Sequence, residues 1–448
     1  MSVTQVETIS PSAPRPWTPT WWRTEARWLS LLAPLAIFAG HMSWGAVLPK
    51  TALTLALACS LLLLAALATP GVRKDLEKLR GLRWPAILFA VTLFAILWSM
   101  TPFAPGGPHP VWKYVGVGPA ASTMDKSQTL LELIKLLGLA GIFMLGCVLG
   151  ASDSRARASL NVILALGAAM GFWAFLQFAG GALGPGVRRL GASFENPNTA
   201  ATFFGMLLPL GLAGAISRAA SGRRDLASAA PSIGASLVFA ACVLATASRG
   251  GFLATAAGLV TFAVLQTFGA KAKWTPATIG LAAGIVIFAA LLAVAGGGLI
   301  SRLGESSWDL NGRRAIFTTH WHAFLGAPWM GYGLGTFDAV NRVLLDAETV
   351  GPMWVVRAAH NVYLTWLEQA GVVGAIPMFL AIASVLLITL RRAVARSRFK
   401  TALFALLAAD IVILVHGATD FALETYSVAA FWSLLLGLQF SASQGSRR

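Results

Sequence analysis

The chain has 448 residues, of which 56% are hydrophobic and only 12% are charged. Because soluble domains carry about 25% charged residues, this composition excludes an ordinary soluble domain and indicates an integral membrane protein. The formal net charge of +16 would suit a nucleic-acid partner. The basic residues, however, stand mainly in short loops between apolar segments, as is typical of membrane proteins.

The apolar segments predict the fold. Residues 1–28, which include a stretch rich in Ser, Thr and Pro, are expected to form a disordered tail. A spanning helix needs about 20 mostly apolar residues. Hydropathy predicts about twelve such helices in one all-α polytopic domain, residues 29–441, followed by a short tail, residues 442–448. The predicted helices cover residues 29–48, 51–69, 85–100, 130–150, 158–180, 199–216, 231–247, 250–268, 276–299, 372–390, 401–416 and 426–441.

The basic residues predict the orientation, because Lys and Arg in short loops favour the cytoplasm. Most of the 34 basic residues fall on one side of the membrane if the N-terminus is cytoplasmic. Both tails are then cytoplasmic, and a nucleic-acid partner is disfavoured. Most of the remaining basic residues fall on or near the outer side, many of them in the loops 181–198 and 301–359.

The outer loop region, residues 301–371, is long and has its own pattern. Apolar residues at helical spacing (Ile316, Phe317, Trp321 and Phe324) predict an amphipathic helix over the membrane mouth. A Gly-rich stretch, residues 326–337, and a short helix near residues 337–347 follow. The glycines suit either a turn or a phosphate-binding loop, and the lack of a preceding strand favours the turn. Long ordered loops in compact proteins are usually functional.

Arginines mark three points near the outer face. Arg188 and Arg189 precede an Asn-Pro-Asn turn, and Arg249 lies at the tip of a predicted tight hairpin between the seventh and eighth helices. Arg313 and Arg314 begin the amphipathic stretch. Arginine pairs with phosphate oxygens through a two-donor fork, so these positions predict a phosphorylated, membrane-bound substrate. Each has a simpler alternative as well: a solvated side chain, or for Arg249 a snorkelling or carboxylate-paired one.

His360 stands at the start of a predicted helical stretch beside Asn361. Histidine is the commonest general base, although a histidine at a helix start often serves only as a hydrogen-bonding residue. Glu368 follows about two helical turns later on a similar face, where it is positioned to orient the site. No His, Asp or Glu cluster has metal-ligand spacing, and no Asp-x-Asp pair occurs, so a metal site is disfavoured. The three cysteines lie in apolar runs and are expected to be buried packing residues.

Five stretches in this order resemble the O-antigen ligase/polymerase superfamily. They are RLGASFENPN (189–198), SRG (248–250), GRR (312–314), GAPWMGYGLGTF (326–337) and AHNVYLTWLEQAGVVG (359–374), within residues 130–440. The resemblance implies a twelve-helix, GT-C-like membrane glycosyltransferase in the bacterial inner membrane. It also implies inverting transfer on the periplasmic face, without a metal or cofactor.

The resemblance further implies roles for particular residues. Arg189 and Arg249 would bind the diphosphate of an undecaprenyl-diphosphate-linked oligosaccharide donor, and Arg313 would help to shape the site. His360 would activate a hydroxyl of the acceptor, which is a glycan or lipid A-core. The supporting residues are Asn196, Asn198, Asn361 and Glu368. Arg189 has the family spacing to the Asn-Pro-Asn turn and Arg188 does not, whereas Glu195 departs from the small residue often found there.

Two enzymatic functions fit these residues: a polymerase of polysaccharide repeat units, which we favour because no lipid A-core site is evident, and an O-antigen ligase. A transporter of polysaccharide or lipid is an alternative of another class. It predicts ionisable residues at the bilayer midplane, whereas the polar residues here gather at the outer edge, with Lys135 and Asp410 as the main exceptions. A non-catalytic scaffold among polysaccharide assembly proteins is a third class.

Overall fold

The computed structural model describes residues 26–116, 118–181, 189–194, 196–219, 226–269, 306–347, 349–396 and 399–445. Within these ranges the chain is helical and contains no strand. The elements are α2 (Leu29–Met42), η1 (Trp44–Ala46), α3 (Pro49–Leu67), α4 (Pro70–Glu77), α5 (Arg83–Ser99), α6 (Trp112–Val115), α7 (Lys126–Gly150), α8 (Asp153–Ala179), α9 (Pro197–Ala219), α10 (Leu226–Ala245), α11 (Arg249–Gly269), α14 (Ser306–Gly326), α15 (Phe337–Val343), α16 (Val350–Met353), α17 (Val362–Ala395), α18 (Lys400–Gly417), η2 (Ala422–Glu424) and α19 (Tyr426–Ala442).

The helices confirm an all-α protein of membrane type. Eight of the described helices are long and apolar enough to cross a membrane, and α2, α5 and α19 are shorter apolar helices. Together they occupy eleven of the twelve predicted segments. The remaining one, residues 276–299, lies outside the described residues, as does most of the predicted N-terminal tail. The three cysteines are free and buried, as expected.

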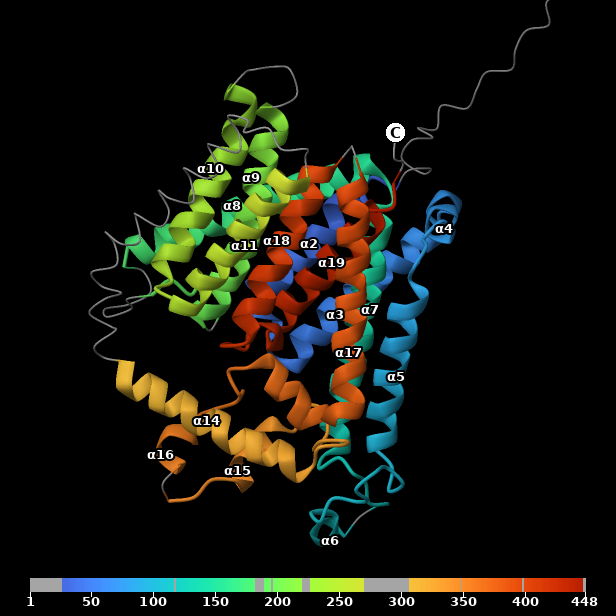
Figure 1. Cartoon of the computed structure of the whole chain (residues 1–448), viewed down its shortest axis with the longest axis vertical. Coiled ribbons are helices and arrows are strands. Elements are labelled where there is room, and N and C mark those ends of the chain that lie inside the picture. The colour runs from blue at the N-terminus through green and yellow to red at the C-terminus, as the bar shows by residue number, and fades with distance from the viewer. Residues whose placement is uncertain are drawn as a thin grey trace, which may run out of the picture.

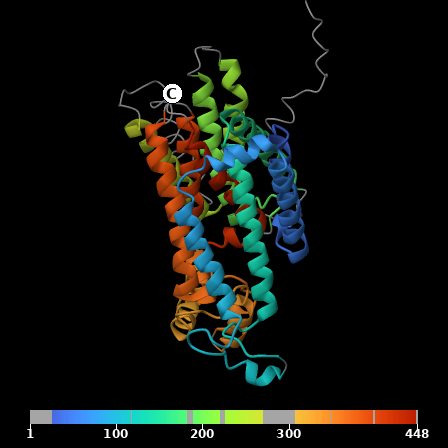
Figure 2. The same cartoon turned by 90° about the vertical axis from the view of Figure 1, so that its right-hand side faces the viewer.

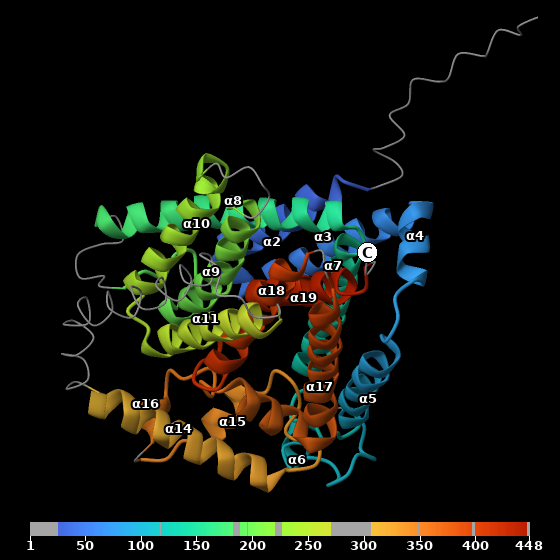
Figure 3. The ribbon, with the colours of Figure 1, turned by 45° about the horizontal axis from the view of Figure 1, so that its top comes forward.

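The bundle is built around α18 and α19, which lie near its centre (Figures 1 and 3). The most extensive packing pairs α7 with α19, α9 with α10, and α11 with α18, followed by α17 with α5. Figure 2 shows α5, α7 and α17 as three long helices side by side. The core between α2, α9 and α19 is aromatic: Phe203 lies 5.3 Å from Phe431 and 5.8 Å from Phe38, ring centre to ring centre, in edge-on contacts.

The predicted hairpin between α10 and α11 exists, but its two helices do not pack along each other. Only residues 246–248 separate them, while α11 packs mainly on α18 and α9, and α10 mainly on α9. The turn is therefore pressed against the end of α18 instead of standing free at the membrane surface.

Beyond the same end of the bundle lie α14, α15 and α16, which belong to the predicted outer loop (Figure 1). The amphipathic helix is present, but its buried face differs from the prediction. Ile316, His320 and Phe324 are buried, whereas Trp321 is 47% exposed. The inward face follows a spacing of four residues and includes a histidine, which a pattern built from apolar residues alone does not detect.

The Gly-rich stretch is held against a break in α17. Gly371 has φ 59° and ψ −176°, which interrupts the helix, and the carbonyls of Glu368 and Gln369 then accept hydrogen bonds from Tyr332 N and Gly333 N at 2.9 and 2.8 Å. The amides of the Gly-rich stretch thus bind the broken helix. This supports the turn interpretation over a phosphate-binding loop.

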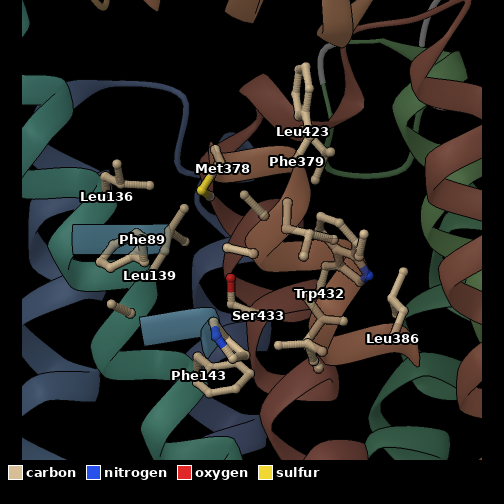
Figure 4. Close-up of a pocket in the computed structure, with 18 of the residues that line it drawn as sticks. Phe89, Leu136, Leu139, Phe143, Met378, Phe379, Leu386, Leu423, Trp432 and Ser433 are labelled. Carbon is tan, nitrogen blue, oxygen red and sulfur yellow. The ribbon is translucent and has the colours of Figure 1, made fainter. Parts of the chain in front are cut away.

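An apolar cavity of about 400 Å³ lies between α5, α7, α17, α18 and α19. Figure 4 shows that its labelled side chains are almost all hydrocarbon or aromatic, among them Phe89, Leu139 and Phe143. Because the lining runs from Leu82 before α5 to Leu423 in η2, the cavity extends along much of the bundle.

Candidate functional site

The segment that carries Arg189 docks on the turn between α10 and α11. Arg189 Nε donates a hydrogen bond to the Thr246 carbonyl at 2.9 Å, and Leu190 N donates to the Ala245 carbonyl at 2.9 Å. A terminal nitrogen of Arg189 donates to Asn198 Oδ1 at 2.7 Å. Two stretches 57 residues apart in the sequence are thereby joined, and the half-buried Arg189 guanidinium is held in place by these contacts.

Asn196 and Asn198 have separate roles at the start of α9. Asn196 Oδ1 accepts from Asn198 N at 2.8 Å, and Pro197 is the first residue of the helix. This is a side-chain cap followed by a residue that suits the first helical position. Asn198 is buried and bridges Arg189 to Asp420, since its Nδ2 lies 3.5 Å from Asp420 Oδ1.

Arg249 is the first residue of α11 and is half-buried. Ser248 Oγ accepts from Gly251 N at 3.2 Å and so caps this helix. A Cβ at Gly250 would lie 3.0 Å from both His416 Nε2 and Thr419 Oγ1. A side chain after the arginine would therefore require the His416 and Thr419 side chains to shift, because both lie close to the backbone at Gly250.

The loop between α18 and α19, residues 418–425, connects the arginine-bearing elements to His360. Arg313 donates from a terminal nitrogen to the Thr419 carbonyl at 3.0 Å. The next residue, Asp420, is fully buried, and its Oδ1 lies 3.6 Å from His360 Nδ1. Phe421 packs edge-on against the His360 ring at 4.8 Å between ring centres. The imidazole is thus held between a carboxylate and an aromatic ring, with 23% of its side chain exposed.

His360 lies just before α17 in a left-handed backbone conformation, φ 52°. Asn361 caps the helix, because its Oδ1 accepts from Tyr363 N and Leu364 N at 3.0 and 3.1 Å. A left-handed conformation is uncommon in a residue other than glycine and tends to occur at functional sites. Asn361 therefore acts through the helix start and not as a neighbour of the reacting atoms.

Glu368, which was expected to orient the site from the face of His360, pairs with His320 in the structure. Glu368 is fully buried and its Oε2 lies 2.8 Å from His320 Nδ1, while His320 Nε2 lies 3.3 Å from Asn341 Oδ1. The expected shared face requires one continuous helix from His360, but that residue is outside α17 and has a non-helical conformation. Asp420 occupies the position expected for Glu368, and Glu368 instead fastens α14 to α17.

In two places the sequence offers a pair of adjacent arginines, and the structure distinguishes the members of one pair. Arg313 is half-buried and contacts the loop 418–425, whereas Arg314 is exposed. Arg188 and Glu195 lie outside the described residues. Asp410, one of the two exceptions inside the apolar helices, accepts hydrogen bonds from Trp432 Nε1 at 2.8 Å and Gln439 Nε2 at 2.7 Å.

Sequence reasoning passed over two residues at this site. His416 Nδ1 lies 2.5 Å from Thr202 Oγ1, and Asp420 faces His360. Their signal was a histidine and an aspartate four residues apart at the end of an apolar helix, a spacing that puts both on one side of a helix end. The contacts bring Arg189, Arg313 and the imidazole–carboxylate pair around residues 418–425, and Gly250, next to Arg249, lies close to His416 and Thr419. Such a set can hold an anion next to a proton acceptor.

Residues 234–379 match the family model described as O-antigen ligase. The matched range contains Arg249, Arg313, His360 and Glu368, and it ends before Asp420. No curated protein matches the chain. The match supports the O-antigen ligase/polymerase superfamily, and with the apolar helices it supports a multi-pass membrane protein of polysaccharide biosynthesis that transfers glycosyl groups.

Proposed function

We propose that this chain belongs to the O-antigen ligase/polymerase superfamily and is an inverting, metal-independent glycosyltransferase whose donor is an undecaprenyl-diphosphate-linked glycan. Its products in this proposal are polymerised repeat units of an O-antigen or exopolysaccharide. The observation that carries the proposal is the convergence on residues 418–425 of Arg189, Arg249, Arg313 and the His360–Asp420 pair.

The chemistry follows from this arrangement. A His360 tautomer with its proton on Nδ1, toward Asp420, leaves the Nε2 lone pair to take the proton of an acceptor hydroxyl. The acceptor oxygen then bonds to the anomeric carbon as the bond from that carbon to the phosphate oxygen breaks. The diphosphate leaves with the electron pair, and the Asp420 carboxylate stabilises the imidazolium that forms.

The arginines act on the leaving group. Negative charge grows on the diphosphate as the sugar bond breaks, and guanidinium groups fixed beforehand by protein contacts stabilise that charge without reorganising. Arg189 and Arg313 are anchored by hydrogen bonds to Asn198 and to the Thr419 carbonyl. Because these charges are always present, no divalent metal is needed in this mechanism.

The apolar cavity supports a substrate that carries a hydrocarbon chain. It is lined by apolar side chains of five elements and lies within the bundle (Figure 4). A polyprenyl chain gains about 0.8 kcal/mol for each buried CH₂ relative to water, although a chain already in lipid gains less. In this proposal the site faces the periplasm of a bacterial inner membrane, with both termini cytoplasmic.

The ligase is a second candidate because the matched family model is described as O-antigen ligase. It would move the finished glycan to lipid A-core with the same donor chemistry. A deletion strain separates the two. Loss of long polymer while single capped repeat units persist supports the polymerase, and accumulation of polymer on the carrier lipid supports the ligase.

The test of catalysis uses the purified full chain with lipid-diphosphate-linked glycan in EDTA. His360→Ala should lower transfer by about 10²–10⁴-fold, the usual contribution of a general base. Arg249→Ala and Arg313→Ala should also lower it, while Arg314→Ala, a matched change at an exposed neighbour, should not. Equal product from the wild type and all of these variants would refute the site assignment, whereas no product from the wild type would favour a transporter or scaffold.

A further inference from the structure

A second, polar pocket of about 260 Å³ adjoins the loop 418–425, which contributes Leu423 and Glu424 to its lining. It is distinct from the arginine-bearing elements, since its lining comes from α7, α15, α17, η2 and α19 and from Arg357. Its charged side chains are Glu132, Lys135, Asp338, Arg357 and Glu424, so carboxyl groups and cations both line it. Thr365 and Gln369 add neutral polar groups, and Trp366 forms part of the wall.

The charges in this pocket largely cancel. Lys135 Nζ lies 2.7 Å from Glu132 Oε1, and Thr365 Oγ1 donates to Glu424 Oε1 at 3.1 Å. The Glu424 side chain has a solvent-accessible surface, but its carboxyl group is surrounded by many protein atoms, which reduce its hydration. This burial, reinforced by the nearby charge of Asp420, raises the pKa of Glu424 to about 8, so its carboxyl group is mainly protonated at neutral pH.

Such a lining suits a neutral polyol better than a diphosphate. The carboxyl, amide and hydroxyl groups both donate and accept hydrogen bonds, as sugar hydroxyls require, while the carboxylate of Glu132 would oppose a second anion. Trp366 offers an apolar ring surface for the C–H face of a sugar. A pocket of about 260 Å³ has room for roughly one sugar ring.

The pocket is linked to His360 through the loop 418–425. The loop 418–425 presents Asp420 to His360 and, four residues later, Glu424 to the pocket. Thr365 N donates to the Asn361 carbonyl at 2.9 Å, so the pocket begins one helical turn after the residue next to His360. In an inverting displacement the nucleophile approaches the face opposite the leaving group. The acceptor is therefore expected across His360 from the arginines.

We propose that this pocket, which we call the acceptor pocket (Glu132, Lys135, Thr365, Trp366, Gln369 and Glu424), is a saccharide subsite that binds a sugar ring of the acceptor glycan. The inference rests on the proposed glycosyl transfer and adds the acceptor's position. It also explains why the polar pocket shares Leu136, Leu139 and Val362 with the apolar cavity, since a membrane-borne glycan has both a polar and an apolar part.

The test separates the acceptor from the donor. The acceptor probe is a synthetic repeat unit of the host polysaccharide with a benzyl group at its reducing end, which lacks a diphosphate and cannot act as a donor. Transfer from the lipid-linked donor is measured while each substrate is titrated in turn. The variants are Glu132→Gln and Glu424→Gln, with Asp346→Asn, an exposed carboxylate in the same outer loop region, as the matched control.

Each pocket variant should raise the KM for the benzyl acceptor about tenfold, because a hydrogen bond to a charged or buried group is weakened. The donor KM and kcat should stay within about twofold, and the control should match the wild type. Saturation-transfer NMR of the benzyl acceptor without donor should show the same loss, which separates binding from turnover. Wild-type acceptor KM in both pocket variants would overturn the subsite while leaving the proposed function intact. No transfer by the wild-type protein from any lipid-linked donor would refute the proposed function and this inference with it.

Discussion

The break in α17 provides a quantitative test of the structure through Gly371→Ala. The backbone of Gly371, φ 59° and ψ −176°, is in a region that is essentially restricted to glycine, and a residue with a side chain there costs about 1–3 kcal/mol. The new Cβ would also lie 2.2 Å from the Trp329 carbonyl oxygen and 2.5 Å from Met330 N. These are backbone atoms that cannot rotate away, and such overpacking costs about 1–3 kcal/mol.

The two effects together predict a loss of about 2–6 kcal/mol in the free energy of unfolding. The substitution should also weaken the contact between the Gly-rich stretch and α17, including the hydrogen bonds from Val372 N to Pro328 O and from Val373 N to Trp329 O, at 2.8 and 3.1 Å. Because His360 precedes the same helix, transfer activity should fall along with stability.

The assay is thermal unfolding of the purified protein in detergent, and unfolding is measured as the loss of soluble protein. The melting temperature should drop by more than about 3 °C. Gly234→Ala is the matched control: Gly234 lies within α10, and a Cβ there would meet no heavy atom within 4 Å, so it should be neutral or slightly stabilising. Equal melting temperatures for Gly371→Ala and wild type would refute the proposed helix break.

Four further outcomes are expected. Asp420→Asn should lower kcat by about 10²-fold or more with little change in donor KM, because His360 loses the carboxylate that stabilises its protonated form. An unchanged kcat and pH–rate profile would contradict the role of Asp420 as the partner of His360. His320→Ala should destabilise the protein by about 1–3 kcal/mol by leaving the buried Glu368 without its partner, measured as a lower melting temperature, whereas wild-type stability would show that the pair is dispensable. The pKa of Glu424 is raised from 4.5 to about 8, so between these pH values the unfolded chain binds fewer protons than the folded one, and stability falls as pH rises. The melting temperature of Glu424→Gln should therefore decline less than that of the wild type from pH 5 to 8. Parallel curves for the two proteins would contradict the raised pKa. Transfer should persist in EDTA, and its restoration only by added divalent cations would contradict metal independence.

The sequence was sufficient for features that depend on neighbouring residues. Apolar runs of helical length located the helices of the described bundle, because hydrophobic length is a property of contiguous sequence. Turns and helix starts also depend on neighbouring residues. The Gly-rich stretch forms a turn, and the Asn-Pro-Asn and His-Asn stretches each stand at the start of a helix. The order of the arginine and histidine motifs pointed to a superfamily that the family match over residues 234–379 supports.

The partners of the charged groups depended on tertiary structure. His360 faces Asp420, 60 residues away, and Glu368 faces His320 on another helix. Nothing in local spacing selects these pairs, because each depends on how α14, α17 and α18 pack and on the non-helical conformation of His360. The sequence alone therefore determined which segments form helices and which residues can carry the chemistry. Only the packing of those helices decided which carboxylate meets which imidazole, since side chains far apart in the chain are brought together by burial of the faces between them.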